Sequence, residues 1–215
     1  MNEIQTKLPS DTWVDCSWHD FSQLIQAPEY EKAKCYYYNG QLRIEMPPVG
    51  PDHAVDNGIM VILINLFGIV RNIQMNLLIN CSYRKPSTKE AQPDICYYIG
   101  ERAKLAPTGS SVVNLDYNVP PDLAIEVADT SLSDDLGQKR LLYEDLAVAE
   151  YWVVDVKKAR ITAFKIVPNG GSHRIEESVV LPKLAIALLE EGLRRSRQTD
   201  HTTVGAWFLG TLSAS

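Results

Sequence analysis

The dipeptide Asn39-Gly40 separates two β-rich runs, residues 35–38 and 42–46. Asn-Gly is the preferred sequence of the tight turn that joins two antiparallel strands, so these residues predict a β-hairpin. Pro47-Pro48 ends the second strand, and Pro51 is well suited to the first turn of a helix that we expect to run to about residue 67. A hairpin followed by a long apolar helix therefore opens the core of the fold.

The rest of the chain alternates strand-like and helix-like patterns. Runs of β-branched and aromatic residues predict strands over 77–81, 95–99, 123–127, 151–156 and 160–167, with a further edge strand over 174–180. A locally basic loop is expected over 82–92, and an irregular connection with a short strand near Val112 over 101–121. Helices are expected over 18–25, 133–146 and 182–195. This order favours an α/β or α+β fold in which a mixed β-sheet is flanked by helices.

Length and composition favour a single domain. The chain has 215 residues, of which 45% are hydrophobic and 22% charged, as in an average globular domain. Within this domain we expect a helical cover over residues 1–30, the core over 31–195 and a weakly determined tail over 196–215.

Charge and hydropathy restrict the environment and the partners of the protein. The net charge of -6 excludes a general positive field that would attract nucleic acid or an anionic membrane. The apolar stretch 59–70 is shorter than the roughly 20 residues of a membrane span, and no secretory signal is recognisable. We therefore expect a cytoplasmic protein without a membrane segment. The four scattered cysteines are typical of reduced core residues rather than of a zinc site.

Two carboxylates stand at positions where a purely structural sequence would not need them. Glu126 interrupts the apolar strand 123–127, and alternation places it on the same face as the small residue Ala124. Asp94 follows Pro93 at the start of the strand 95–99, on the opposite face from the apolar side chains of that strand. Because Mg²⁺ prefers carboxylate oxygens, two acids on adjacent strands predict a divalent-metal site.

Lys139 lies in the helix expected after the strand of Glu126, and this helix can fold back over the sheet. In phosphodiester hydrolysis, metal-bound carboxylates orient the attacking water, while a lysine stabilises the charge that develops on the phosphoryl group. Each residue also has an ordinary explanation, because an Asp after Pro is often a turn residue, a strand Glu often lies at an edge, and a helical Lys is usually solvated. Their order along the chain favours the functional interpretation.

The segment PDLAIEVADTSLSDDLGQKRLLYEDLAVAEYWVVDVKKARITAFK, residues 121–165, resembles the signature of the Uma-type restriction endonuclease-like family. This family belongs to the PD-(D/E)XK nuclease superfamily. The upstream segments NGQLRIEMPPVGPDH (residues 39–53) and EAQPDICYY (residues 90–98) are similar to the family in the same order. The resemblance covers roughly residues 30–195 and implies a restriction endonuclease-like core.

The resemblance also implies roles for individual residues. Asp94 and Glu126, with Val127, match the positions that bind Mg²⁺ or Mn²⁺, and His53 matches the histidine of the upstream motif, which contacts metal or water. The lysine of the superfamily normally follows its acid by two residues, where this chain has Ala128. Lys139 in GQKRLLY matches the position to which this family has moved the lysine. His53 could instead be a simple helix-cap or surface residue.

The chain departs from the family pattern at two positions. Asp129 stands where the family usually has serine and adds a negative charge, and Tyr36 stands where many members have a glutamate. Glu45 and Glu90 are spare carboxylates that could compensate for the missing acid. We expect Tyr143, one turn after Lys139, to pack and to orient its helix.

The leading hypothesis is a Mg²⁺- or Mn²⁺-dependent DNA endonuclease in which Asp94, Glu126, Lys139 and His53 are catalytic. The alternative is an inactive nuclease fold that serves as a binding or assembly module, which suits the acidic composition. A hydrolase of a small phosphate compound remains a third hypothesis, although no glycine-rich phosphate loop is present. Cleavage of two strands related by symmetry would favour a homodimer.

Overall fold

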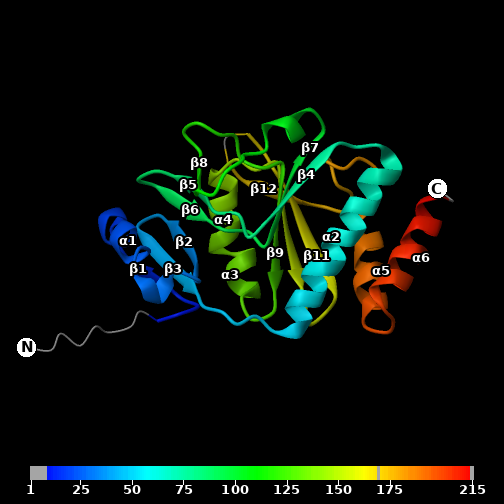
Figure 1. Cartoon of the computed structure of the whole chain (residues 1–215), viewed down its shortest axis with the longest axis horizontal. Helices are drawn as coiled ribbons and strands as arrows, with labels where there is room; N and C mark the ends of the chain where they lie inside the picture. The colour runs from blue at the N-terminus through cyan, green and yellow to red at the C-terminus, as the bar shows by residue number, and fades with distance from the viewer. Residues whose placement is uncertain (1–8, 169, 214–215) are drawn as a thin grey trace, which may run out of the picture.

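A computed structural model describes residues 9–168 and 170–213 of the chain. These residues form two six-stranded sheets, with helices between the sheets and on the outer face of each (Figure 1). The mixed α/β class agrees with the sequence analysis, but the strands divide between two sheets where a single sheet was expected. The division arises because the predicted hairpin pairs with residues 89–91 and not with the strands of Asp94 and Glu126.

The small sheet is built on the predicted hairpin, which is confirmed. Asn39 and Gly40 have φ angles of 50° and 75°, the left-handed conformation that a type I′ turn requires. The strands of this sheet, in the order β1-β3-β2-β6-β5-β8, are β1 (Trp13–Asp15), β2 (Lys34–Tyr38), β3 (Gln41–Glu45), β5 (Tyr83–Lys85), β6 (Lys89–Ala91) and β8 (Val113–Asn114). The loop expected over 82–92 is therefore wrong, since this segment forms β5 and β6. The sequence did not indicate these strands because they are too short and too polar to show an apolar alternation.

The central sheet has the strand order β12-β11-β10-β9-β7-β4. Its strands are β4 (Met75–Ile79), β7 (Ile95–Ile99), β9 (Leu123–Ala128), β10 (Glu150–Asp155), β11 (Arg160–Ile166) and β12 (Ser172–Ile175). β9 and β10 are parallel, whereas the other neighbours are antiparallel. Four strands start within one residue of their predicted positions, but β4 and β12 each start two residues early, and β12 ends before 180.

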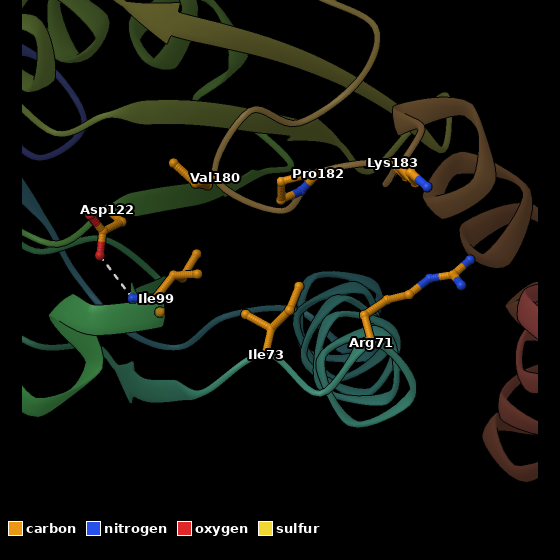
Figure 2. A pocket seen from close by; sticks show the side chains of 8 residues that line it. Arg71, Ile73, Ile99, Asp122, Val180, Pro182 and Lys183 are labelled. Atoms are coloured by element: carbon orange, nitrogen blue, oxygen red, sulfur yellow. Dashed lines mark hydrogen bonds between the residues drawn. The ribbon is translucent and has the colours of Figure 1, made fainter.

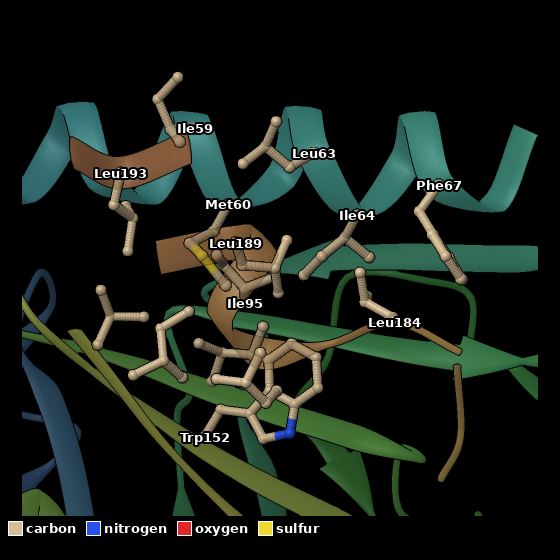
Figure 3. Packing of buried hydrophobic residues seen from close by; sticks show 14 of the residues in the cluster. Ile59, Met60, Leu63, Ile64, Phe67, Ile95, Trp152, Leu184, Leu189 and Leu193 are labelled. Atoms are coloured by element: carbon tan, nitrogen blue, oxygen red, sulfur yellow. The ribbon is translucent and has the colours of Figure 1, made fainter. Parts of the chain in front are cut away.

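One face of the central sheet is covered by α2 (Pro51–Arg71), α5 (Ile186–Ser196) and α6 (His201–Ser213). Figure 3 shows side chains of α2, among them Met60 and Ile64, directed toward Ile95 and Trp152 of the sheet. The weakly determined tail expected over 196–215 is wrong for the described residues up to 213. This segment contains α6, whose residues Val204 and Phe208 pack against α2. The last predicted helix starts at Ile186, four residues after Pro182.

The other face of the central sheet holds α3 (Leu132–Leu136) and α4 (Gln138–Asp145), which lie between the two sheets (Figure 1). A single helix over 133–146 was expected, but the chain breaks at Gly137. A Cβ at this position would lie 2.8 Å from the Ser133 carbonyl oxygen, so only glycine fits. The chain changes direction at this break, and Lys139 lies in the first turn of α4.

The outer face of the small sheet carries α1 (Trp18–Leu24), a short 3₁₀ helix (Pro28–Tyr30) and buried aromatic residues such as Phe21. The Ser17 hydroxyl accepts a hydrogen bond from the Asp20 N–H at 3.1 Å and caps α1, so the helix expected over 18–25 is confirmed. The helical cover expected over residues 1–30 also contains the strand β1, and its first eight residues lie outside the described residues. A second 3₁₀ helix (Gly100–Leu105) follows β7.

One helix among the described residues, α2, is long and apolar enough to cross a membrane by length and composition alone. The same property is expected of a buried core helix, and α2 packs on the central sheet and against α5 and α6. Its length of 21 residues exceeds the apolar stretch 59–70 on which the sequence analysis relied.

Candidate active site

Two carboxylates lie together where β7 and β9 separate. The antiparallel register places Ile95 opposite Ile125, so one step further along the two chains Asp94 lies opposite Glu126. Only 5% and 3% of these two side chains are exposed, and both line a cavity of about 440 Å³. The structure thus brings together the two acids that the sequence analysis selected, while their role as metal ligands stays a prediction.

The Asp94 carboxylate is held by three groups. Its Oδ2 accepts a hydrogen bond from the Val127 N–H at 2.8 Å and lies 3.4 Å from His53 Nε2. Its Oδ1 forms an ion pair with the Lys34 ammonium. Burial by itself would raise the pKa of Asp94, but the hydrogen bond from His53 and the charge of Lys34 hold this pKa well below its ordinary value. Asp94 is therefore a stable anion at neutral pH.

The Glu126 carboxylate has weaker support. The Tyr143 hydroxyl donates to its Oε1 at 2.7 Å, and the Tyr36 hydroxyl lies 3.1 Å from the same oxygen. Its Oε2 accepts no hydrogen bond from the part of the chain that the structure describes. Burial raises the pKa of Glu126 to about 8, because the charge of Lys139 only partly offsets the loss of water and the repulsion from Asp94. A further positive charge in the cavity would stabilise this anion.

The Lys139 ammonium lies among carboxylates. Its Nζ is 2.7 Å from Glu45 Oε1, 2.9 Å from Asp135 Oδ1 and 4.0 Å from Glu126 Oε1, and it sits above the Tyr36 ring at 4.1 Å from the centroid. Burial alone would lower the pKa of Lys139, but the surrounding carboxylates raise it above its ordinary value. Lys139 therefore keeps its charge inside the protein, where an unpaired ammonium would be unstable.

The small sheet supplies the opposite wall of the site. The register of β2 and β3 pairs Lys34 with Glu45 and Tyr36 with Arg43. Arg43 is also buried, and it donates to Glu45 at 2.8 Å and to Asp134 at 3.0 Å. Glu45 is thus held between two cations, which explains why its pKa stays low despite burial. The site is assembled from both sheets and from the first turns of α2 and α4.

The other acids that the sequence analysis named do not all lie at the cavity. Asp129 lines the same cavity and lies 4.0 Å from Lys157, whereas Glu90 is paired with Arg84 in the small sheet and does not line the cavity. Of the two spare carboxylates, only Glu45 therefore joins the site.

The basic loop expected over 82–92 is not a free positive patch. Arg84 is paired with Glu90, Lys85 with Asp116 at 2.6 Å, and Lys89 with Asp145 at 3.7 Å. Since each cation is neutralised by a neighbouring acid, these residues offer little net charge to a phosphate backbone.

Sequence reasoning did not select Lys34, and it treated Tyr143 only as a packing residue. The hairpin contained a signal for Lys34, because a two-residue turn at Asn39-Gly40 places residue 34 opposite residue 45. No local pattern shows that Tyr143 reaches Glu126, since this contact depends on how α4 packs on the sheet.

A larger cavity, of about 500 Å³, lies at the other end of the central sheet (Figure 2). It is lined by apolar side chains, including Ile73 and Val180, together with Lys183 and Asp122. Asp122 is already satisfied, because it accepts a hydrogen bond from the Ile99 N–H at 2.8 Å and pairs with Arg102 at 2.6 Å. This cavity therefore lacks an acid with an unengaged oxygen, such as Glu126 in the cavity of Asp94.

The donors around the smaller cavity suit a divalent cation. Residues 9–168 and 170–213 contain no group of three or more His, Cys, Asp or Glu side chains that could hold a metal ion, so any site here relies on two carboxylates. Asp94 and Glu126 provide hard oxygen donors from adjacent strands, and Glu126 Oε2 is not engaged by any described residue. An open site with two carboxylates is typical of Mg²⁺, which retains several water ligands.

One protein-family model matches most of the chain. The family model Uma2, described as "Putative restriction endonuclease", matches residues 18–202. The chain belongs to the Uma2 family.

The fold is similar to the crystal structure of a putative nuclease belonging to DUF820 from Anabaena variabilis ATCC 29413. The TM-score is 0.53 at 16% identity, and the match covers 90% of this chain and 99% of the other. No curated protein matches the chain. The structural match supports the fold, and the family match supports membership in Uma2.

Proposed function

We propose that this Uma2 protein is a divalent-metal-dependent endonuclease that hydrolyses phosphodiester bonds in DNA. The observation that carries the proposal is the register of β7 and β9, which sets Asp94 and Glu126 side by side on the wall of one cavity. Asp94, Glu126 and Val127 would hold Mg²⁺ or Mn²⁺, which when bound supplies Lewis-acid stabilisation of the phosphoryl oxygens. Family membership supports the same reaction class.

The protein's own residues fix the two carboxylates for this task. The Val127 N–H and His53 hold one oxygen of Asp94, and Tyr143 holds one oxygen of Glu126. These contacts leave the second oxygen of Glu126 for another ligand. Because these hydrogen bonds fix the two carboxylates in advance, their charges need not be rearranged during the reaction.

Lys139 has a positioning role in this proposal. Its ammonium balances Glu45 and Asp135 and lies 4.0 Å from Glu126, so it stabilises the anionic form of that carboxylate. This differs from direct contact with the phosphate, because the Lys139 side chain is only 1% exposed.

The overall charge of -6 does not favour tight binding of duplex DNA. Among the cations that line the cavity, Lys34 offers a local contact to a phosphate group because its side chain is partly exposed. We therefore expect weak, metal-assisted binding that depends strongly on salt. The competing hypothesis, a nuclease fold that only binds or assembles, does not require metal binding and predicts no cleavage.

The decisive experiment is cleavage of supercoiled plasmid by the purified chain over a series of Mg²⁺ and Mn²⁺ concentrations, beside a folded Asp94→Asn variant. Metal-dependent nicking that disappears in the variant supports the proposal. If the wild-type protein binds neither metal and leaves the plasmid intact, the proposed activity is wrong and the binding-module hypothesis is favoured. Cleavage that persists in Asp94→Asn would show that another site or a contaminant is responsible.

A further inference from the structure

The two lysines of the site differ in their access to the cavity. Lys139 is 1% exposed, and its Nζ has Glu45 and Asp135 within 3 Å. Lys34 is 19% exposed, and its ammonium has a single carboxylate partner, Asp94 Oδ1, among the described residues. A phosphate group that enters the cavity can therefore reach Lys34, whereas the carboxylates around Lys139 both enclose and neutralise its charge.

The contact of Lys34 is made with the oxygen of Asp94 that matters for metal binding. Asp94 Oδ2 already accepts a hydrogen bond from the Val127 N–H at 2.8 Å and lies near His53. Oδ1 is therefore the oxygen with which Asp94 can bind a cation in the cavity, and Lys34 lies on it. The Lys34 ammonium and a divalent cation are alternative partners of the same atom.

The carboxylate opposite Lys34 on the neighbouring strand, Glu45, is already neutralised by two other cations. Lys139 at 2.7 Å and Arg43 at 2.8 Å both contact its Oε1, so Glu45 attracts Lys34 less than a carboxylate without partners would. A lysine has a flexible four-carbon stem, so an ammonium displaced from Asp94 can move several ångströms without a change in the backbone. The free direction for this movement is the cavity, which Lys32 and Lys34 both line.

We propose that Lys34 is a further catalytic residue, whose ammonium leaves Asp94 Oδ1 when a divalent cation binds there and then contacts the phosphate group that is hydrolysed. This inference rests on the proposed function. It assigns the direct phosphate contact to Lys34 and leaves to Lys139 the positioning of the carboxylates. Lys34 forms no covalent bond and transfers no proton in this role; it stabilises the negative charge on the phosphoryl oxygens.

The test measures metal affinity and cleavage separately. Mn²⁺ binding is measured by titration calorimetry without DNA for the wild type, Lys34→Gln, Lys34→Arg and Lys32→Gln. Lys32→Gln is the matched control, because it removes the same charge from the same cavity without a contact to Asp94. We expect Lys34→Gln to bind Mn²⁺ about tenfold more tightly, since the competing cation is gone, and yet to cleave plasmid about a hundredfold more slowly.

Two further variants separate the effect of the charge at residue 34 from the effect of its removal elsewhere in the cavity. Lys34→Arg should keep Mn²⁺ affinity near that of the wild type and restore part of the cleavage, while Lys32→Gln should change both quantities by less than about threefold. Thermal unfolding checks that each variant is folded. The opposite signs of the two effects of Lys34→Gln distinguish this role from a merely structural one, which would weaken both.

Several results would overturn the inference. Unchanged or weaker Mn²⁺ binding by Lys34→Gln would exclude the competition for Asp94, and so would equal affinities of Lys34→Gln and Lys34→Arg. Cleavage by Lys34→Gln at the wild-type rate would exclude the phosphate contact. If the wild type binds Mn²⁺ but cuts no DNA, the proposed function fails, whereas the calorimetric comparison still decides whether Lys34 competes with the metal.

Discussion

Two buried glutamates on adjacent parallel strands have very different surroundings. Glu150 at the start of β10 is 0% exposed, and Glu126 near the end of β9 is 2% exposed. Both oxygens of Glu150 are satisfied: Oε1 accepts from the Val180 N–H at 2.9 Å, and Oε2 accepts from Trp152 Nε1 at 2.9 Å and from the Ser178 hydroxyl at 3.0 Å. Glu150 is thus a structural anion that fastens residues 178–180 to the sheet.

Glu126 has fewer donors for the same degree of burial. The hydroxyl groups of Tyr36 and Tyr143 approach only one of its oxygens, and the nearest cation, Lys139, is 4.0 Å away. A buried carboxylate without enough donors is costly, which is why its pKa is raised to about 8. The comparison teaches that incomplete hydrogen bonding, rather than burial alone, distinguishes an acid prepared for a ligand from one that holds the fold together.

The largest expected effect follows from removing the charge of Glu126. Glu126→Gln keeps the shape of the side chain, and we expect metal-dependent cleavage to fall by about a thousandfold or more. Stability to urea should not decrease, because a neutral group suits this site better than a charged one. The measurement is plasmid cleavage together with urea unfolding. If Glu126→Gln cut DNA at the wild-type rate, the functional role of Glu126 would be wrong.

The matched change at Glu150 should have the opposite outcome. In Glu150→Gln the amide NH₂ group faces either the Val180 N–H or Trp152 Nε1, depending on its orientation, so at least one buried donor loses its partner. We expect the free energy of unfolding to fall by about 3 kcal/mol, with normal cleavage by the folded fraction. Urea unfolding followed by Trp fluorescence measures this loss. If Glu150→Gln were as stable as the wild type, the structural role of this acid would be wrong.

The sequence predicted the local parts of this fold better than their assembly. Asn39-Gly40, Pro51 and the apolar runs of β7, β9 and β10 are strong local signals, and each gave an element close to its observed bounds. The strands β5 and β6 were missed because a strand of three polar residues is formed by its partner strands and not by its own pattern. Helix α6 was missed because the segment after residue 195 was interpreted as a tail. Its buried apolar residues Val204, Phe208 and Leu212 nevertheless repeat every four positions, as in a helix.

The candidate site was also predicted only in part. Alternation along β9 and the proline before Asp94 were sufficient to select the two acids, since strand periodicity decides which face a side chain occupies. The contacts that separate Glu126 from Glu150 come from α4, from β2 and from residues 178–180, which are distant in sequence. No spacing rule contains this information, so the sequence alone could not tell the two glutamates apart.

The pH dependence of stability offers a third test of the difference. The pKa of Glu126 is about 8 in the folded protein against an ordinary value of 4.5, so the folded state holds a proton that the unfolded chain has released. The stabilisation from this group is complete below about pH 4.5 and is lost as the pH rises through 8. We expect Glu126→Gln to gain up to about 1 kcal/mol relative to the wild type for each pH unit in this range. Urea unfolding at several pH values measures this gain, and a constant difference would contradict the raised pKa.

The smallest effect is expected from the tyrosine hydroxyl that approaches Glu126 most closely. Tyr143→Phe removes the 2.7 Å hydrogen bond to Oε1 but keeps the aromatic ring stacked on Tyr151. Since the lost bond favours the anion, the pKa of Glu126 should rise further, and Mn²⁺ binding should require a higher pH. Stability at neutral pH should change by about 1 kcal/mol or less. Calorimetric titration with Mn²⁺ over a pH series checks this shift.

Tyr38→Phe is the matched control for this last prediction, because the Tyr38 hydroxyl contacts Asp145 at 3.2 Å, away from Glu126. This control should leave the pH dependence of Mn²⁺ binding unchanged. If Tyr143→Phe also leaves it unchanged, the hydroxyl does not tune the carboxylate, and the contrast with Glu150 has to rest on Lys139 and burial alone. A shift to higher pH in Tyr143→Phe only would show that one neutral donor, placed by α4, sets the acid for its ligand.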